Sequence, residues 1–138
     1  MTETYLLDSC IVIELLRERP KVMEWLESIS EDSNLAISGW TLLELMKEKT
    51  SKQEMTDVIA KLQSYQILWP SPDKCNEVPS ILIQYYHTER DTAGKLKGNA
   101  IFDALIYVTA KSYSVKLVTM NGGFGFVSDI TVIRLPSS

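Results

Sequence analysis

Short apolar runs alternate along this chain with longer stretches that carry apolar residues at helical spacing. This pattern predicts strands that alternate with helices. The strand runs are mostly apolar throughout, which is typical of strands covered on both faces. Strands are predicted in a run that stops at Asp8 and at residues 34–38, 66–69, 115–119 and 130–135. We therefore expect a three-layer α/β domain with a parallel sheet of about five short strands, because such strands need crossover connections.

The helices predicted between these strands follow apolar stripes and begin near residues that suit a first turn. Pro20 and Pro79 are two of these, since proline is favoured at the first helical position. Helices are predicted at residues 9–19, 20–29, 39–46, 53–65, 79–86 and 99–113. The last of them is apolar almost all round and should be largely buried. Residues 73–78 fit no single element, and residues 90–98 are predicted to form a polar loop.

Asp8 is the first candidate for a functional site. It stands between a buried strand and a helix, and ligands of open parallel sheets bind beyond the carboxyl ends of strands. Aspartate is also one of the best N-caps, because its carboxylate accepts a hydrogen bond from the first turn. Capping alone explains this position, so a functional site requires further acids that reach the same point.

Two more acids have a functional and a structural interpretation. Glu44 completes a Thr41-x-x-Glu44 capping box if its helix begins at Thr41, whereas a start at Ser38 or Gly39 leaves it available for a site. Asp103 lies inside the most apolar helix, where a lone buried carboxylate is costly. The alternative is that Asp103 lies on a narrow solvent-facing stripe. We favour a site that uses the charge.

Asn121 follows the predicted strand 115–119, although Asn-Gly is also a common turn pair. Together with the three acids, Asn121 offers oxygen ligands from four separate segments. Crowded carboxylates repel one another unless a cation neutralises them, and Mg²⁺ or Mn²⁺ suits oxygen ligands. A metal ion at such a place activates water and stabilises charge on a phosphodiester. The chemistry that this constellation permits is therefore metal-assisted phosphodiester hydrolysis, although periodicity alone does not show that these residues meet.

Four segments resemble the motifs of the PIN-domain family in order and spacing, most closely those of VapC-type ribonuclease toxins. These segments are residues 6–13, 36–45, 98–106 and 117–121. The resemblance covers nearly the whole chain and implies one PIN-like α/β/α domain over residues 1–138. It also implies Mg²⁺- or Mn²⁺-dependent RNA cleavage, homodimers and inhibition by a small DNA-binding antitoxin protein.

The resemblance assigns roles by position. Asp8, Glu44 and Asp103 match the three core acids, which would hold the metal ion and make the site catalytic. Ser9 matches the small hydroxyl residue after the first acid, and Asn121 matches the polar residue of a Thr-x-Asn/Asp motif, where it would orient a water or an outer ligand.

This chain departs from the family pattern after Asn121. Many members carry a fourth acid at or shortly after this position, but here no acid occurs before Asp129. We expect Asp129 to belong to the start of the last strand. The departure weakens the case for two metal ions and leaves one ion held by three carboxylates.

The sequence signals for substrate and partner surfaces are less specific than those for the candidate site. Arg90, Lys95 and Lys97 precede the Asp103 helix and are predicted to contact RNA phosphates, with a solvated loop as the alternative. The early helices carry many apolar residues, which form either core or a face for an antitoxin or a second copy. These residues are Ile11, Ile13, Leu15, Leu16, Val22, Met23, Trp25 and Leu26.

Composition narrows the function classes. A net charge of −4 argues against strong non-specific DNA binding, which depends on Lys and Arg. Cys10 and Cys75 form no disulfide or zinc pattern. The start has no signal-peptide pattern, and no apolar run approaches the roughly 20 residues that span a bilayer. We therefore expect a cytoplasmic protein without a membrane partner.

The sequence thus predicts a metal-dependent endoribonuclease, the toxin of a toxin–antitoxin pair. The second interpretation is a degenerate PIN-like module that binds RNA or protein without cleaving. A receiver-like phosphoacceptor domain is disfavoured, because it needs paired acids after the first strand and a lysine after a late strand.

Overall fold

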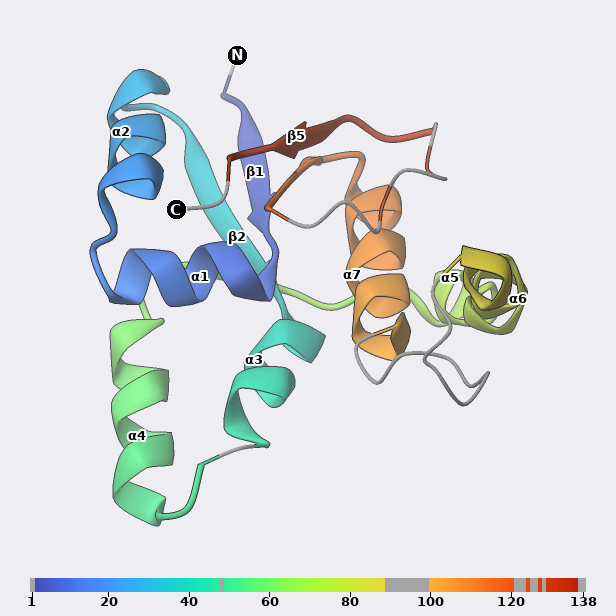
Figure 1. Cartoon of the computed structure of the whole chain (residues 1–138), viewed down its shortest axis with the longest axis horizontal. Coiled ribbons are helices and arrows are strands. Elements are labelled where there is room, and N and C mark those ends of the chain that lie inside the picture. Colours follow the sequence, from blue (N-terminus) through green and yellow to red (C-terminus); the bar gives the residue numbers. More distant parts are fainter. Residues whose placement is uncertain are drawn as a thin grey trace.

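Strands and helices alternate along the chain in the predicted order (Figure 1). The computed structural model describes residues 2–47, 49–88, 100–120, 124, 127 and 129–136, without the side chains of residues 85–88. The strands are β1 (Thr4–Leu7), β2 (Asn34–Ser38), β3 (Gln66–Leu68), β4 (Lys116–Thr119) and β5 (Val132–Arg134). The helices are α1 (Ser9–Leu16), α2 (Pro20–Ser28), α3 (Gly39–Met46), α4 (Lys52–Lys61), α5 (Pro72–Cys75), α6 (Val78–Thr88) and α7 (Ala100–Tyr113). None of the helices in this described part is long and apolar enough to cross a membrane.

The strands form one parallel sheet in the order β3-β2-β1-β4-β5. From β1 the chain proceeds to one side through β2 and β3. It then returns to the other side of β1 for β4 and β5. The direction of the connections therefore reverses between β1 and β4, and this reversal marks the usual ligand site of an open parallel sheet.

Both faces of the sheet are covered, which confirms the predicted three layers. Figure 1 shows α1, α2 and α4 on one side of the strands and α5, α6 and α7 on the other. Alternate residues of β1 serve the two sides, because successive side chains of a strand point in opposite directions. Tyr5 and Leu7 pack with α1, α2 and α4, whereas Leu6 packs with α6 and α7.

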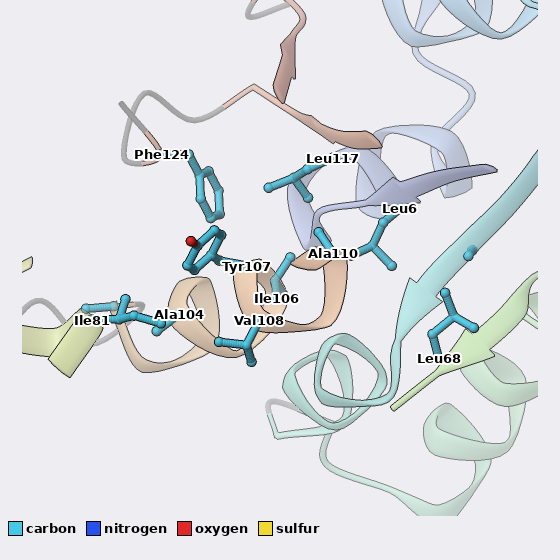
Figure 2. Packing of buried hydrophobic residues seen from close by; sticks show 12 residues of the cluster. Leu6, Leu68, Ile81, Ala104, Ile106, Tyr107, Val108, Ala110, Leu117 and Phe124 are labelled. Carbon is cyan, nitrogen blue, oxygen red and sulfur yellow. The ribbon is translucent and has the colours of Figure 1, made fainter. Parts of the chain in front are cut away.

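Helix α7 is the central element of one layer, and most of its side chains are buried as predicted. Figure 2 shows its apolar residues between the sheet and α6, with the ring of Phe124 pointing toward Tyr107. Ile101 in the first turn and Tyr113 at the end of the helix are exceptions, because each is about half exposed. Tight packing on both sides fixes the position of α7 relative to the ends of β1 and β2.

The structure corrects several predicted boundaries. Helix α1 ends at Leu16, since Glu18 has a left-handed backbone with φ of 53°. Helix α4 ends at Lys61. The short helix α5 was not predicted, because four residues are too few to show helical periodicity. Ser71 accepts a hydrogen bond from Lys74 N–H and Pro72 occupies the first turn, which explains why a helix forms there.

The apolar residues of the early helices belong mainly to the core. Ile11, Leu15 and Val22 are buried. Partly buried residues pack against the same core, and these are Leu16, Met23, Trp25 and Leu26. The structural interpretation is therefore confirmed for these residues.

Candidate functional site

Asp8 lies where β1 ends and α1 begins. Its backbone N–H donates to Val118 O at 2.9 Å, so the pairing of β1 with β4 extends to this residue. Its backbone carbonyl accepts from Ile11 N and Val12 N and so starts α1. Only 2% of Asp8 is exposed. The fold thus places a carboxylate in a buried position beside the reversal point of the sheet.

Both oxygens of the Asp8 carboxylate accept hydrogen bonds. Ser9 N–H donates to Oδ1 at 2.8 Å, which makes Asp8 the N-cap of α1. The Thr119 hydroxyl donates to Oδ2 at 2.7 Å from the end of β4. The capping hydrogen bond uses Oδ1 alone, so capping does not by itself exclude a functional role for this carboxylate.

The surroundings of Asp8 raise the pKa of its carboxyl group above the ordinary value of 3.8. Burial is the main cause, because a charged carboxylate loses its hydration. Hydrogen bonds from Thr119 and Ser9 act in the opposite direction and lower the pKa, but burial outweighs them. A cation beside this carboxylate would stabilise the charged form.

Cys10 adds a further contact to the same oxygen. Its thiol donates to Asp8 Oδ2 at 3.5 Å and accepts a hydrogen bond from Met120 N–H at 3.4 Å. Burial and the negative charge of Asp8 raise the pKa of the Cys10 thiol to about 11. The thiol is therefore protonated at neutral pH and able to donate.

Glu44 lies within α3, and its structural alternative is excluded. The helix begins at Gly39, and the Ser38 hydroxyl caps it by accepting from Trp40 N–H at 3.2 Å. Thr41 is therefore inside the helix, and Thr41-x-x-Glu44 does not form a capping box. Glu44 and Ser9 line one open cavity of about 620 Å³.

Asp103 is 7% exposed in the first turn of α7, so the solvent-facing alternative is wrong. Helix α3 lies between α1 and α7 and contacts both (Figure 1). The Lys47 ammonium lies 5.0 Å from the centre of the Phe102 ring. Because Phe102 is adjacent to Asp103, this contact brings the end of α3 against the turn that carries Asp103.

The predicted acids thus lie on neighbouring elements. The described residues, however, contain no group of three or more Asp, Glu, His or Cys side chains arranged to hold a metal ion. Mg²⁺ is usually held by one or two carboxylates together with waters and substrate phosphate. The buried carboxylates Asp8 and Asp103, with Glu44 at the cavity, fit such a cation in donor type. The three-carboxylate site stays a prediction.

Asp129 lies away from these acids. Its carboxylate accepts from the Tyr107 hydroxyl at 2.7 and 2.9 Å and forms an ion pair with Lys111 at 3.3 Å. It precedes β5, at the edge where β4 and β5 begin, whereas Asp8 follows the end of β1. Asp129 therefore belongs before the last strand, as expected.

The other predicted residues lie outside the described part of the chain. These residues are Arg90, Lys95, Lys97 and Asn121. Conversely, the structure adds Thr119 and Cys10, which the sequence analysis did not select. Thr119 is two residues before Asn121, but its contact with Asp8 depends on β4 lying beside β1, which no local pattern reveals.

Comparison with known proteins is consistent with this geometry. The family model of the PIN domain matches residues 5–128. VapBC-1 from nontypeable Haemophilus influenzae is similar with a TM-score of 0.70 and 23% identity, over 95% of this chain and 97% of that chain. VapBC2 from Rickettsia felis, bound to a promoter DNA fragment, is similar with a TM-score of 0.69 and 20% identity, over 96% of this chain and 98% of that chain. A toxin–antitoxin complex from Klebsiella pneumoniae is similar with a TM-score of 0.66 and 24% identity, over 91% of this chain and 94% of that chain. A comparison with curated proteins gives no match.

Proposed function

Because this chain belongs to the PIN domain family, we propose that it is a divalent-metal-dependent endoribonuclease that hydrolyses RNA phosphodiester bonds. The observation that carries the proposal is the buried Asp8 carboxylate at the reversal point of the sheet, with its raised pKa. A buried charge of this kind costs stability unless a partner compensates it. Binding a cation there is a function that accounts for this cost.

In this proposal Asp8, Asp103 and Glu44 hold Mg²⁺ or Mn²⁺. When bound, the cation supplies an activated water and stabilises charge on the phosphodiester. Thr119 and Ser9 hold the Asp8 carboxylate in place through their hydrogen bonds. We further propose the roles predicted from the sequence for residues outside the described part. Asn121 orients a water, and the basic residues of the loop contact RNA phosphates. Those basic residues are Arg90, Lys95 and Lys97.

We also propose that the protein is the toxin of a toxin–antitoxin pair, with a small antitoxin as partner and a homodimer as its assembly. The support is the likeness in fold to chains of VapBC and other toxin–antitoxin complexes over nearly their whole length. Coexpression with a candidate antitoxin should restore growth that the protein alone inhibits. Growth that is unaffected by the protein alone would contradict the toxin role.

Cleavage of RNA tests the catalytic proposal. Asp8→Asn and Asp103→Asn should each lower the cleavage rate roughly a hundredfold or more, the size expected for a charged catalytic group. Asp129→Asn is the matched control, because the same substitution is made away from the candidate site, where Asp129 contacts Tyr107 and Lys111. It should cleave at the parent rate. Full activity of either site variant in the presence of Mn²⁺ would contradict the mechanism.

The second candidate is a degenerate PIN-like module that binds RNA or protein without cleavage. The observation that favours it is the run after Asn121, which carries no acid before Asp129. Such a module would bind RNA equally well with and without Mn²⁺. An RNA-binding titration at both conditions therefore separates the two functions.

A further inference from the structure

The Cys10 thiol lies among three groups that come from two distant parts of the chain. Its sulfur is 3.5 Å from Asp8 Oδ2, 3.8 Å from Thr119 Oγ1 and 3.4 Å from Met120 N. Asp8 belongs to the turn from β1 to α1, whereas Thr119 and Met120 belong to the chain that leaves β4. The thiol therefore joins the two strand ends that flank the reversal point of the sheet.

A thiol suits this position because it both donates and accepts. It donates to the carboxylate of Asp8 and accepts the backbone N–H of Met120, which begins the segment leading to Asn121. An alanine at this position would leave the N–H of Met120 without this acceptor and Asp8 Oδ2 without the thiol donor. The carboxylate and the chain after β4 would then lose a shared anchor.

We propose that Cys10 is a positioning residue that holds the Asp8 carboxylate beside the Met120 backbone in the geometry needed to bind a divalent cation. This inference rests on the proposed function. Residues that orient a metal-binding carboxylate contribute to metal affinity although they do not touch the metal themselves. Cys10 acts through Asp8 in this way and has no covalent role.

The chain offers a matched control. Cys75 lies in α5 and is partly buried like Cys10. Within the described residues its thiol makes no hydrogen bond with a site residue. Cys75→Ala therefore removes the same group without touching Asp8.

The experiment measures Mn²⁺ affinity by calorimetry and the exchange rate of the Met120 amide by NMR. Cys10→Ala should bind Mn²⁺ about tenfold more weakly than the parent, at the low end for such residues because a thiol is a weak donor. Its Met120 amide should exchange at least tenfold faster. Cys10→Ser should recover both, because a hydroxyl also donates and accepts, and Cys75→Ala should change neither.

The outcomes separate the inference from the proposed function. Mn²⁺ binding by the parent that Cys10→Ala leaves unchanged would overturn the role of Cys10 and leave the nuclease proposal standing. A lower melting temperature of Cys10→Ala with unchanged Mn²⁺ affinity would show a merely structural role and also overturn it. Absence of Mn²⁺ binding by the parent, with and without a short RNA, would overturn both.

Discussion

At the scale of single residues, Asp8 has a structural role that favours burial and a proposed role as a metal ligand that needs a charge. Its backbone and Oδ1 start a helix, while burial disfavours the charge that a metal ligand needs. Thr119 and Ser9 compensate part of this cost through hydrogen bonds to the ionised carboxylate. The remaining cost supports the proposed role of Asp8 as a metal ligand, because a neutral asparagine would cap the helix as well.

Asp8→Asn should therefore leave the melting temperature at pH 7 unchanged or raise it. The folded-state pKa of Asp8 is raised above 3.8, so stability falls as the pH rises from 3.8 through the folded-state pKa. The variant does not lose stability in this way, so its melting temperature should equal or exceed that of the parent at pH 7. Below pH 3.8 the two melting temperatures should become equal. Circular dichroism melting at pH 7 and pH 3 measures the difference. A melting temperature several degrees lower at pH 7 would contradict a functional cost at this site.

Sequence alone selected Asp8, Glu44 and Asp103 as candidates, together with Ser9. It did not select Thr119 or Cys10, which also contact the Asp8 carboxylate. An acid after an apolar run is a local signal, and so is an aspartate inside an apolar helix. The contacts of Asp8 with Thr119 and Cys10 depend on which strands are neighbours. Neighbourhood in a sheet is set by packing of the whole chain and leaves no mark at either residue.

At the scale of elements, the start of α3 determines where Glu44 lies. Ser38 caps the helix, and its hydroxyl also shares a hydrogen bond with Thr109 of α7 at 2.8 Å. Gly39 follows, and the ring of Trp69 occupies the space in which a Cβ of this residue would lie. The Trp40 ring meets that of Trp69 edge to face at 5.8 Å. A glycine is required because a Cβ would collide with this ring.

Gly39→Ala should destabilise the fold by about 1–3 kcal/mol, the usual cost of overpacking. Urea denaturation measures this change. In a Trp69→Ala background the same substitution should be neutral or slightly stabilising, because glycine costs a helix about 0.5–1 kcal/mol relative to alanine. Equal destabilisation in both backgrounds would show that the Trp69 contact is not the cause.

At the scale of the whole molecule, ion pairs connect the segment before β5 with helix α7. Lys111 of α7 pairs with Glu77 at 2.9 Å and with Asp129 at 3.3 Å. The hydrogen bond from the Tyr107 hydroxyl is the main cause that lowers the pKa of Asp129. The hydrogen bond from Lys111 is the main cause that lowers the pKa of Glu77. These contacts join the loop before β5 to α7 at the edge of the sheet where β4 and β5 begin.

Asp129→Asn should lower the melting temperature at pH 7 by only about 1–3 °C, because the Lys111–Asp129 pair is partly exposed and screened by solvent. The folded-state pKa of Asp129 lies below 3.8, so its contribution is present above pH 3.8 and lost as the pH falls through the folded-state value. The deficit should therefore shrink at pH 3. This dependence has the opposite sign to that of Asp8→Asn, and a deficit that grows in acid would contradict it.

The layered fold was predictable because strands buried on both faces are apolar runs and the helices between them have clear stripes. The order of the strands was not, since several orders satisfy the same pattern. Helix α5 was missed because its stabilisation comes from a cap and a proline rather than from a periodic face. The same holds for the candidate site: the sequence indicated its acids but not how they are arranged in space.

In the proposed function, the acids at the end of β1 and on α3 and α7 bind a divalent cation. The most direct test is calorimetric titration of Mn²⁺ into the parent and Asp103→Asn, with Asp129→Asn as control and a repeat with a short RNA. We expect the parent and the control to bind alike and Asp103→Asn to bind roughly tenfold or more weakly. Parent protein that binds no Mn²⁺ even with RNA, or Asp103→Asn with parent affinity, would contradict the claim.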